Sequence, residues 1–317
     1  MKILIAVPCF NEESDIKLCI SNLKSLNFDE PNLIVDLVIF NDGSTDSTLD
    51  ILKKIEGIKI LSSQTNYGLA TVFNNIIYYS KKNNYDFLVI FDADNQYPAE
   101  EIPKILNYSY QNNTDITLGT RNFKNNKVFS PFKNFIQKLG SFVVSFILGF
   151  KVLDATTGFR VYSSKALETM FITSSFSYTI ESLFVAKRYK LKILEYNLNK
   201  FNETRDSRLF KSNSQYIFKT IQILSTSIIL YRRNVIKYIY FVLLIPGVIL
   251  ISRFLSKYFL FGTNPGNVQS LTTGLSFILI ATLIYIFLLL ISYIKKYLFT
   301  IQKSTFLADF TELNIKD

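Results

Sequence analysis

Two carboxylates and an amide follow a short apolar run, at a spacing that suits a metal ion. Residues 87–91 are all apolar and predict a strand buried on both faces, and Asp92, Asp94 and Gln96 come directly after it. Open α/β sheets bind ligands at the carboxyl ends of such strands. Hard oxygen ligands so close together suit Mg²⁺ or Mn²⁺ carrying a diphosphate. For an isolated Asp-x-Asp, a capped turn with a solvated second Asp would be the better interpretation.

The elements that must position these side chains are alternating strands and helices. Apolar residues at helical spacing follow the first strand, and Asn11 is expected to cap that helix. The alternation predicts an α/β fold with a doubly wound, mostly parallel sheet. The expected strands are Ile3–Val7, Ile34–Phe40, Ile58–Leu61, Phe87–Phe91 and Ile116–Leu118.

Polar residues suited to a nucleotide follow each of several strands. Glu12 and Asp42 come after the first two strands, and Arg121 comes after the fifth. An Asp in this place can accept a hydrogen bond from a ribose hydroxyl or a base N–H, and an Arg offers a planar fork to phosphate oxygens. Singly, each residue is more easily explained as a turn or cap. Together with the Asp pair, they predict a nucleotide site along one edge of the sheet.

In these motifs the chain resembles family 2 inverting glycosyltransferases, in the branch of dolichyl-phosphate mannose synthases and bacterial polyprenyl-phosphate glycosyltransferases. The resemblance covers roughly residues 1–215. It implies a GT-A fold, a nucleotide-sugar donor, Mg²⁺ or Mn²⁺, and a polyprenyl phosphate acceptor. The matching motifs are Val7-Pro8-Cys9-Phe10-Asn11-Glu12-Glu13, Asn41-Asp42-Gly43-Ser44-Thr45-Asp46, Asn66-x-Gly68, Asp92-Ala93-Asp94-Asn95-Gln96-x-Pro98 and Gly119-Thr120-Arg121.

The resemblance also assigns roles to individual residues. Metal and diphosphate are expected at Asp92, Asp94 and Gln96. Catalytic roles are expected for Asp94, Arg121, Glu181 and Arg205. Contacts to the nucleotide sugar are expected from Pro8, Phe10, Glu12, Phe40, Asp42, Asn66, Gly68, Asp92, Ala93, Arg121, Arg205 and Lys211. The chain departs from the family pattern in having Phe10 where Tyr is common, Asn41 for a frequent Asp, and Arg208 and Phe210 where Gly and Ser are usual.

Two later segments are expected on the acceptor side. The loop 154–160 resembles the family's acceptor loop, and Glu181 opens a helix where the family places a carboxylate facing the acceptor. Glu181 could instead be a first-turn acid that the helix dipole stabilises. The apolar helix expected at Lys133–Phe150 has two open interpretations, a core helix or a segment dipping into lipid headgroups.

Strongly apolar segments near the C-terminus predict membrane attachment. Residues 215–231 are amphipathic, Tyr238 to about Leu260 is apolar with internal cations, and Gly274–Ile294 has no charge. Basic residues flank the two spans and place both ends in the cytoplasm, at a bacterial inner membrane. The expected divisions are a catalytic domain at 1–212, a juxtamembrane helix at 213–234, two transmembrane helices at 235–297 and a cytoplasmic tail at 298–317.

Composition narrows the class of partner and mechanism. The 317 residues carry a formal net charge of +10, with no His and no Trp. There is no zinc spacing, RNA-binding signature or helix-turn-helix pattern, so we expect no nucleic acid. Basic residues beside apolar segments favour a membrane surface. A homo-oligomer packed through the membrane helices is compatible with this composition.

The expected reaction moves one sugar from a nucleotide diphosphate, UDP-glucose or GDP-mannose, to a polyprenyl phosphate with inversion. The acceptor phosphate is already ionised at neutral pH, so the absence of His is no obstacle. The first alternative is a glycosyltransferase that extends a glycolipid or polysaccharide, although processive synthases usually carry a Trp-containing motif that this chain lacks. The second is an inactive, membrane-anchored nucleotide-sugar sensor.

Overall fold

The chain folds into two compact units in a computed structural model. The model describes residues 1–28, 32–121, 131–174, 177–198, 213–231, 233–261, 265–305 and 310–313. One unit, here called the sheet unit, consists of Met1–Ile223 together with Thr305–Asp317. The other, the helical unit, is Leu224–Ser304. The chain therefore leaves the sheet unit and returns to it at its end.

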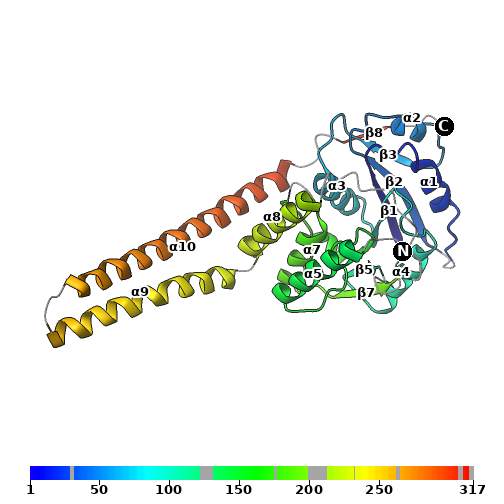
Figure 1. The fold of residues 1–317 in the computed structure, drawn as a ribbon. Coiled ribbons are helices and arrows are strands. Elements are labelled where there is room, and N and C mark those ends of the chain that lie inside the picture. The colour runs from blue at the N-terminus through cyan, green and yellow to red at the C-terminus, as the bar shows by residue number, and fades with distance from the viewer. Residues whose placement is uncertain are drawn as a thin grey trace. The chain divides into compact units, whose positions relative to one another are not determined.

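An eight-stranded, mostly parallel sheet forms the centre of the sheet unit, in the order β7-β5-β6-β4-β1-β2-β3-β8 (Figure 1). β1 pairs in parallel with β2 and β4, β2 with β3, and β5 with β7. β6 is antiparallel between β4 and β5, and β8 is antiparallel to β3. The predicted doubly wound sheet is confirmed. The strands are β1 Lys2–Cys9, β2 Ile34–Asn41, β3 Lys59–Ser62, β4 Phe87–Ile90, β5 Ile116–Thr120, β6 Arg160–Ser163, β7 Ile193–Asn197 and β8 Thr311–Leu313.

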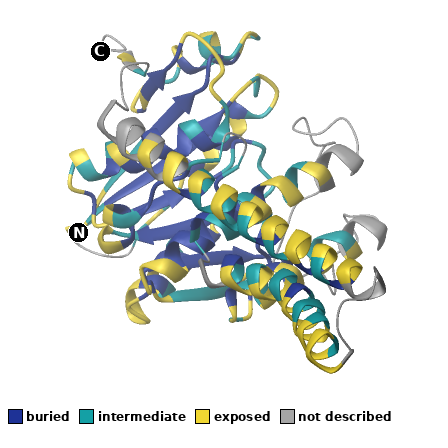
Figure 2. Cartoon of the chain, turned by 90° about the vertical axis from the view of Figure 1, so that its left-hand side faces the viewer, coloured by how far each residue is buried: buried dark blue, intermediate teal, exposed yellow. Residues whose placement is uncertain are grey.

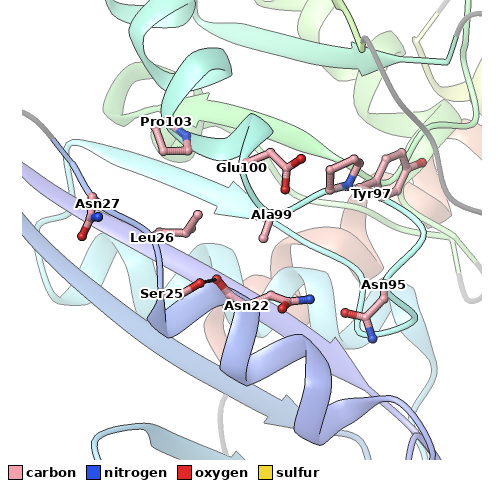
Figure 3. Close-up of a pocket in the computed structure, with 10 residues that line it drawn as sticks. Asn22, Ser25, Leu26, Asn27, Asn95, Tyr97, Ala99, Glu100 and Pro103 are labelled. Carbon is pink, nitrogen blue, oxygen red and sulfur yellow. Dashed lines mark hydrogen bonds between the residues drawn. The ribbon is translucent and has the colours of Figure 1, made fainter.

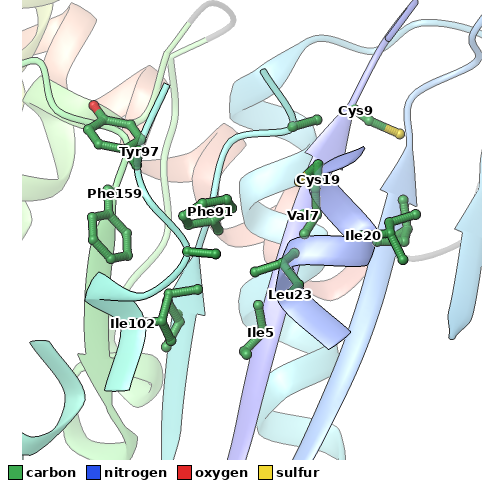
Figure 4. Close-up of a cluster of buried hydrophobic side chains, with 14 of the residues drawn as sticks. Ile5, Val7, Cys9, Cys19, Ile20, Leu23, Phe91, Tyr97, Ile102 and Phe159 are labelled. Carbon is green, nitrogen blue, oxygen red and sulfur yellow. The ribbon is translucent and has the colours of Figure 1, made fainter. Parts of the chain in front are cut away.

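Helices cover both faces of this sheet. Alternate residues of a strand point to opposite faces, and Ile3, Ile5 and Val7 of β1 join a core that includes residues of α1, α2 and α4 (Figure 4). On the other face, α3 packs against β1 and β2. Figure 2 shows buried strands between helices with exposed outer surfaces. The helices are α1 Ile16–Lys24, α2 Thr48–Leu52, α3 Leu69–Lys82, α4 Glu101–Gln111, α5 Pro131–Leu148, α6 Ser164–Thr169 and α7 Thr179–Arg188.

Helix α5 presents an exposed apolar stripe, defined as Phe135, Leu139, Phe142 and Phe146. These residues follow i, i+4, i+7, i+11 spacing and so lie on one side of the helix. Phe142 is 68% exposed and Phe146 is 80% exposed, whereas the opposite side of the helix is buried. The helix is therefore buried on one side and exposed on the other, and contact of its exposed side with lipid headgroups stays a prediction.

The helical unit contains two long apolar helices, α9 (Arg233–Phe261) and α10 (Pro265–Thr305), and the preceding helix α8 (Asn213–Tyr231) crosses the boundary between the units. Val235–Leu260 and Val268–Ile294 are long and apolar enough to span a membrane, and most of their residues are exposed. α9 and α10 touch at two glycines, where a Cβ on Gly247 would lie 2.9 Å from the Gly274 carbonyl oxygen. Only residues without side chains allow backbones to approach this closely.

Candidate functional site

The loops that follow β1 and β2 are tied to each other at the carboxyl edge of the sheet. The Asn11 side-chain oxygen accepts a hydrogen bond from the Thr45 N–H at 2.8 Å, and the Glu12 N–H donates to the Thr48 hydroxyl at 2.7 Å. Asn11 has a φ of +56°, and Asp15 is the residue at the N-cap of α1. The prediction that Asn11 caps α1 is therefore wrong, because its side chain is used to join two loops instead.

Of the aromatic and proline residues expected near the nucleotide, Phe10 is the accessible one. Its ring is 40% exposed at the end of β1, whereas Pro8 and Phe40 are buried. The Phe40 ring packs edge-on against Tyr79 of α3, with centroids 5.9 Å apart. Phe10 can therefore offer a face to a ligand, while Phe40 supports the sheet beneath it.

Asp42 organises the start of α3. Its two carboxylate oxygens accept hydrogen bonds from the Tyr67 and Gly68 N–H groups, both at 2.8 Å. Gly68 is the N-cap of α3 and has a φ of +86°, a conformation that favours glycine. Burial raises the pKa of Asp42, and the two N–H donors oppose that rise. The predicted Asn66 is exposed beside this turn, so Asp42, Asn66 and Gly68 do come together.

Asp92 and Asp94 lie just beyond the centre of the sheet, where β4 ends between β1 and β6. Both are half-buried, and the Asp94 carboxylate accepts a hydrogen bond from the Gln96 N–H at 3.0 Å. Burial raises the pKa of Asp92 to about 7, and the charge of Asp94 adds to the rise while Arg121 opposes it. Two carboxylates that repel each other in a partly desolvated place are suited to share a cation.

The segment before β6 packs directly against Asp92. A Cβ at Gly158 would meet the Asp92 carboxylate, so a larger residue here would force that carboxylate to move. The Tyr178 hydroxyl donates to the Gly158 carbonyl at 2.9 Å, and the Thr157 hydroxyl donates to the Gly119 carbonyl at 2.6 Å. The loop expected on the acceptor side thus forms one wall of the carboxylate site.

Arg121 is held by Asp154, the first residue of the 154–160 motif, and this pairing was not predicted from the sequence. Its Nε lies 2.6 Å from Asp154 Oδ2, and its Nη2 lies 2.8 Å from both Asp154 Oδ1 and the Thr156 hydroxyl. Both charged side chains are buried. Burial alone would raise the pKa of Asp154, but Arg121 holds it below its usual range. Arg121 therefore reaches the site with its guanidinium oriented by a bidentate ion pair.

Glu181 is buried at the start of α7 and holds a neighbouring loop. One carboxylate oxygen accepts from the Thr173 N–H at 2.9 Å and the Thr173 hydroxyl at 2.7 Å, and the other accepts from the Ser174 N–H at 2.7 Å. In the structure this carboxylate orders residues 173–174. These hydrogen bonds make Glu181 a residue that positions the loop.

Arg160 is a further buried cation that sequence reasoning missed. Its guanidinium donates to the Thr157 carbonyl, the Ala155 carbonyl and the Ser182 hydroxyl at 2.6–3.0 Å. Its charge lowers the pKa of Asp92 against the larger effect of burial. The only signal in the sequence was its place at the end of the 154–160 motif. The predicted Arg205 and Lys211 lie outside the described residues.

The oxygen atoms of the Asp92, Asp94 and Gln96 side chains suit a divalent cation whose remaining coordination positions are filled by a bound ligand. Among the residues that the structure describes, no group of three or more His, Cys, Asp and Glu side chains could hold a metal by itself. Mg²⁺ is commonly held by one or two carboxylates, with substrate phosphates and water completing the shell. Asp92 and Asp94, with Gln96 beside them, match that pattern, and the raised pKa of Asp92 marks a charge that a cation would neutralise.

A separate groove of about 520 Å³ lies near this site but does not contain the carboxylates. It runs between the end of α1 and the connection from β4 to α4, and Figure 3 shows Asn22, Asn95 and Glu100 among its lining residues. Neither Asp92 nor Asp94 lines it. The chemistry indicates the carboxylate edge of the sheet as the functional site in preference to this groove.

A family model described as glycosyl transferase family 2 matches residues 4–171. UDP-N-acetylglucosamine--dolichyl-phosphate N-acetylglucosaminyltransferase of Methanococcus voltae is 27% identical over 215 residues, which are 61% of this chain and 83% of the relative. Undecaprenyl-phosphate mannosyltransferase of Micrococcus luteus is 23% identical over 205 residues, 62% of this chain and 82% of the relative.

Glucosyl-3-phosphoglycerate synthase from Mycobacterium tuberculosis, solved with Mn²⁺, UDP and glucosyl-3-phosphoglycerate, has a similar structure. The TM-score is 0.56 at 16% identity, covering 72% of this chain and 78% of that one. At this identity the similarity shows the fold alone. It agrees with the GT-A fold that the sequence motifs predict.

Proposed function

This chain belongs to glycosyl transferase family 2 and is a glycosyltransferase; we propose that it transfers one sugar from a nucleotide diphosphate to a polyprenyl phosphate at a membrane, with inversion. The observation that carries the proposal is the Asp92–Asp94 pair at the carboxyl edge of the sheet, where burial raises the pKa of Asp92 to about 7. A divalent cation with a diphosphate would neutralise this pair. Ligands bind at this edge in open α/β sheets.

For the donor, we assign the nucleotide to the loops after β1, β2 and β3. Phe10 offers an exposed ring, and Asp42 holds the Tyr67–Gly68 turn in place. Pro8, Glu12 and Asn66 lie on the same loops or strand ends, and Ala93 lies in the connection that follows β4. UDP-glucose and GDP-mannose are the donors we favour. The names of the Methanococcus and Micrococcus relatives add N-acetylglucosamine and mannose as sugars to test.

Mg²⁺ or Mn²⁺ at Asp92 and Asp94, with Gln96 nearby, would stabilise negative charge on the leaving diphosphate. Arg121 is the protein's own cation for the same diphosphate. Its orientation is fixed in advance by Asp154, so little ordering is needed when the donor binds. Arg205 and Lys211 stay predicted phosphate contacts.

For the acceptor, the names of two relatives include dolichyl phosphate and undecaprenyl phosphate. A phosphate monoester needs no strong general base at neutral pH, so the enzyme's task is to place its oxygen in line with the donor. We assign the acceptor side to the wall formed by residues 154–160 and to the loop that Glu181 orders. Glu181 acts in this proposal as a positioning residue.

Membrane attachment brings such an acceptor within reach. The segments Val235–Leu260 and Val268–Ile294 are apolar enough to span a bilayer, and the exposed stripe on α5 gives the sheet unit an apolar surface of its own. Exposed Lys138 on α5 and Lys151 just after it suit an anionic headgroup layer. We propose a membrane-bound enzyme with its sheet unit on the cytoplasmic side.

The test uses purified protein in detergent with Mn²⁺ or Mg²⁺, undecaprenyl phosphate and a panel of labelled nucleotide sugars. The expected result is label in the organic phase from one donor, lost on addition of EDTA. Metal-dependent nucleotide binding without lipid labelling by any donor would contradict the acceptor assignment. It would favour a transferase that extends another glycan, or a sensor that binds the nucleotide sugar without reaction.

A further inference from the structure

The C-terminal strand β8 closes one edge of the sheet. It lies beside β3 (Figure 1) and pairs with it in antiparallel orientation. Thr311 lies opposite Ser62, the last residue of β3. In the sheet order, β8 is the outermost strand on this side. Without it, β3 would present a row of unpaired backbone N–H and C=O groups. Three residues near the end of the chain thus decide whether β3 is an interior or an edge strand.

β3 leads directly into the loop 63–68, whose last two N–H groups bind Asp42. The start of this loop is fixed against β2. The Asn41 side-chain amide donates to the Ser62 hydroxyl at 2.9 Å, and the Ser63 N–H donates to the Asn41 carbonyl at 3.0 Å. The position at which β3 ends beside β2 therefore sets the position of the loop.

An aromatic contact anchors the beginning of β8 on β2. The Phe310 ring lies 6.4 Å from the Phe40 ring between centroids, tilted by 55°. Phe40 is buried and stands two residues before Asp42 in the chain. Phe310 is half-buried and packs against the Phe40 ring. β8 and the preceding Phe310 therefore contact both segments that meet at Asp42. The Phe310–Phe40 contact holds the end of β2, and the pairing with β3 holds the strand that leads into the loop 63–68.

From these contacts we infer that β8 is a positioning strand for the donor nucleotide. It fixes β3 and β2 so that the loop 63–68 is already ordered around Asp42 before the nucleotide arrives. This inference rests on the proposed function, because the loop is assigned there to the donor. Phe310 and Thr311 act through the loop and do not touch the nucleotide. A preformed loop lowers the ordering cost of binding, so donor affinity depends on β8.

The experiment compares the full chain with a variant ending at Thr305, which retains both membrane-spanning segments. Both are placed in nanodiscs and titrated calorimetrically with UDP and with GDP in the presence of Mn²⁺. We expect the truncation to raise the Kd of the bound nucleotide about tenfold. In a transfer assay it should raise the donor KM and leave kcat nearly unchanged, since the loop binds ground state and transition state alike.

Point variants separate the strand from a general loss of stability. Phe310→Ala removes the aromatic anchor, and Thr311→Pro removes a backbone N–H from the strand, so both should weaken nucleotide binding. Glu312→Ala is the matched control, because this side chain is exposed and its backbone pairing is retained. A synthetic peptide of residues 306–317 should restore the affinity of the truncated protein. Faster amide exchange at residues 60–68, with 87–90 unchanged, is the expected structural signature.

Equal Kd values for the full and truncated chains would overturn the inference. Loss of affinity that the peptide does not restore, with faster exchange throughout the sheet, would overturn it as well. Failure of the donor assignment in the proposed function looks different, since the full-length protein would then bind neither UDP nor GDP. The identity of the acceptor does not affect this experiment, because nucleotide binding is measured without lipid substrate.

Discussion

Arg121 and Asp154 form a buried, bidentate ion pair, with Nε–Oδ2 at 2.6 Å and Nη2–Oδ1 at 2.8 Å. The pair joins the end of β5 to the segment that precedes β6, and so fixes one wall of the carboxylate site. A bidentate pair sets the direction of the guanidinium as well as its place. The two residues have different roles. Arg121 is proposed to face a diphosphate, whereas Asp154 is structural.

Removing Asp154 should be costly, because it leaves a buried guanidinium without its carboxylate. We expect Asp154→Ala to lower the free energy of unfolding by roughly 3–5 kcal/mol. Chemical denaturation of the full chain in detergent measures this. The control Asp50→Ala changes an exposed carboxylate on α2 and should stay within about 0.5 kcal/mol of the parent. Equal stability of the two variants would contradict the importance of the pair.

The same pair predicts a direction of pH dependence. Arg121 holds the pKa of Asp154 below its usual range, so the folded state favours the ionised carboxylate. Its contribution to stability is fully present above the ordinary carboxyl pKa of about 4 and is lost as the pH falls through the lower folded value. Acid unfolding curves of the parent and Asp154→Ala should therefore converge at low pH. Parallel curves down to acid pH would argue against it.

Metal binding should also weaken as the pH falls, but in a higher pH range than the Asp154 contribution to stability. Burial raises the pKa of Asp92 to about 7, so its stabilising effect belongs to the protonated form and is lost as the pH rises through that value. A cation must displace this proton. We expect Mn²⁺ affinity, measured calorimetrically with UDP present, to fall about tenfold per pH unit below about pH 7. Asp92→Asn should bind Mn²⁺ more weakly and without this slope, and a flat profile for the parent would refute the assignment.

Asp94 is predicted to be essential for transfer and dispensable for folding. Asp94→Ala should reduce sugar transfer by at least about a hundredfold, because it removes a carboxylate that would hold the divalent cation at the diphosphate. Glu100→Ala is the matched control, since this exposed carboxylate lies in the same connection between β4 and α4. Transfer rates of both variants test the catalytic role, and their unfolding temperatures test whether folding is retained. Normal turnover by Asp94→Ala would exclude it from the reaction.

The apolar stripe of α5 should enter the lipid surface. The chain has no Trp, so Phe142→Trp places a single fluorescent probe at a 68% exposed position. In nanodiscs with brominated lipids we expect its emission to be blue-shifted and quenched. Tyr110→Trp on α4 is the control at a similarly exposed site and should not be quenched. Phe277→Trp inside the second apolar span is the positive control, and quenching there but not at residue 142 would contradict the prediction.

Glycine-to-alanine changes should have opposite effects in two helical contexts. A Cβ at Gly247 or Gly274 would press on the facing helix, so either change should cost about 1–3 kcal/mol. Gly140 in α5 has open space around it, and alanine there should stabilise the helix by about 0.5–1 kcal/mol. Unfolding in lipid nanodiscs compares the three. Equal effects at all three positions would rule out close packing of α9 and α10.

Local patterns were sufficient to predict the alternating strands and helices and the carboxylates after β4. Both depend on runs of neighbouring residues, such as the apolar stretch 87–91. The antiparallel insertion of β6 between β4 and β5 was not foreseen, because pairing between distant segments leaves no local period. For the same reason the pairing of Arg121 with Asp154 was not predicted, because the 154–160 motif contains Asp154 but does not indicate which distant side chain it contacts.

Asn11 shows how a local rule can be overridden. Asn is a common N-cap residue, and Asn11 precedes apolar residues at helical spacing, so a cap was expected. In the structure its side-chain oxygen instead accepts a tertiary hydrogen bond from the Thr45 N–H. The sequence also could not decide what covers α5, because an apolar helix has the same residue pattern whether protein or lipid covers it. Arg205 and Lys211 lie outside the described residues and stay predictions, as do the sugar and the oligomeric state.

The return of the chain to β3 also orders events during synthesis. β8 follows both apolar helices in the chain, so both helices are synthesised while the sheet still has an open edge at β3. An open edge invites pairing with other nascent chains. β3 limits that risk, because it is only four residues long and begins with the exposed Lys59. Closure of the sheet edge at β3 therefore waits until both apolar helices have been synthesised.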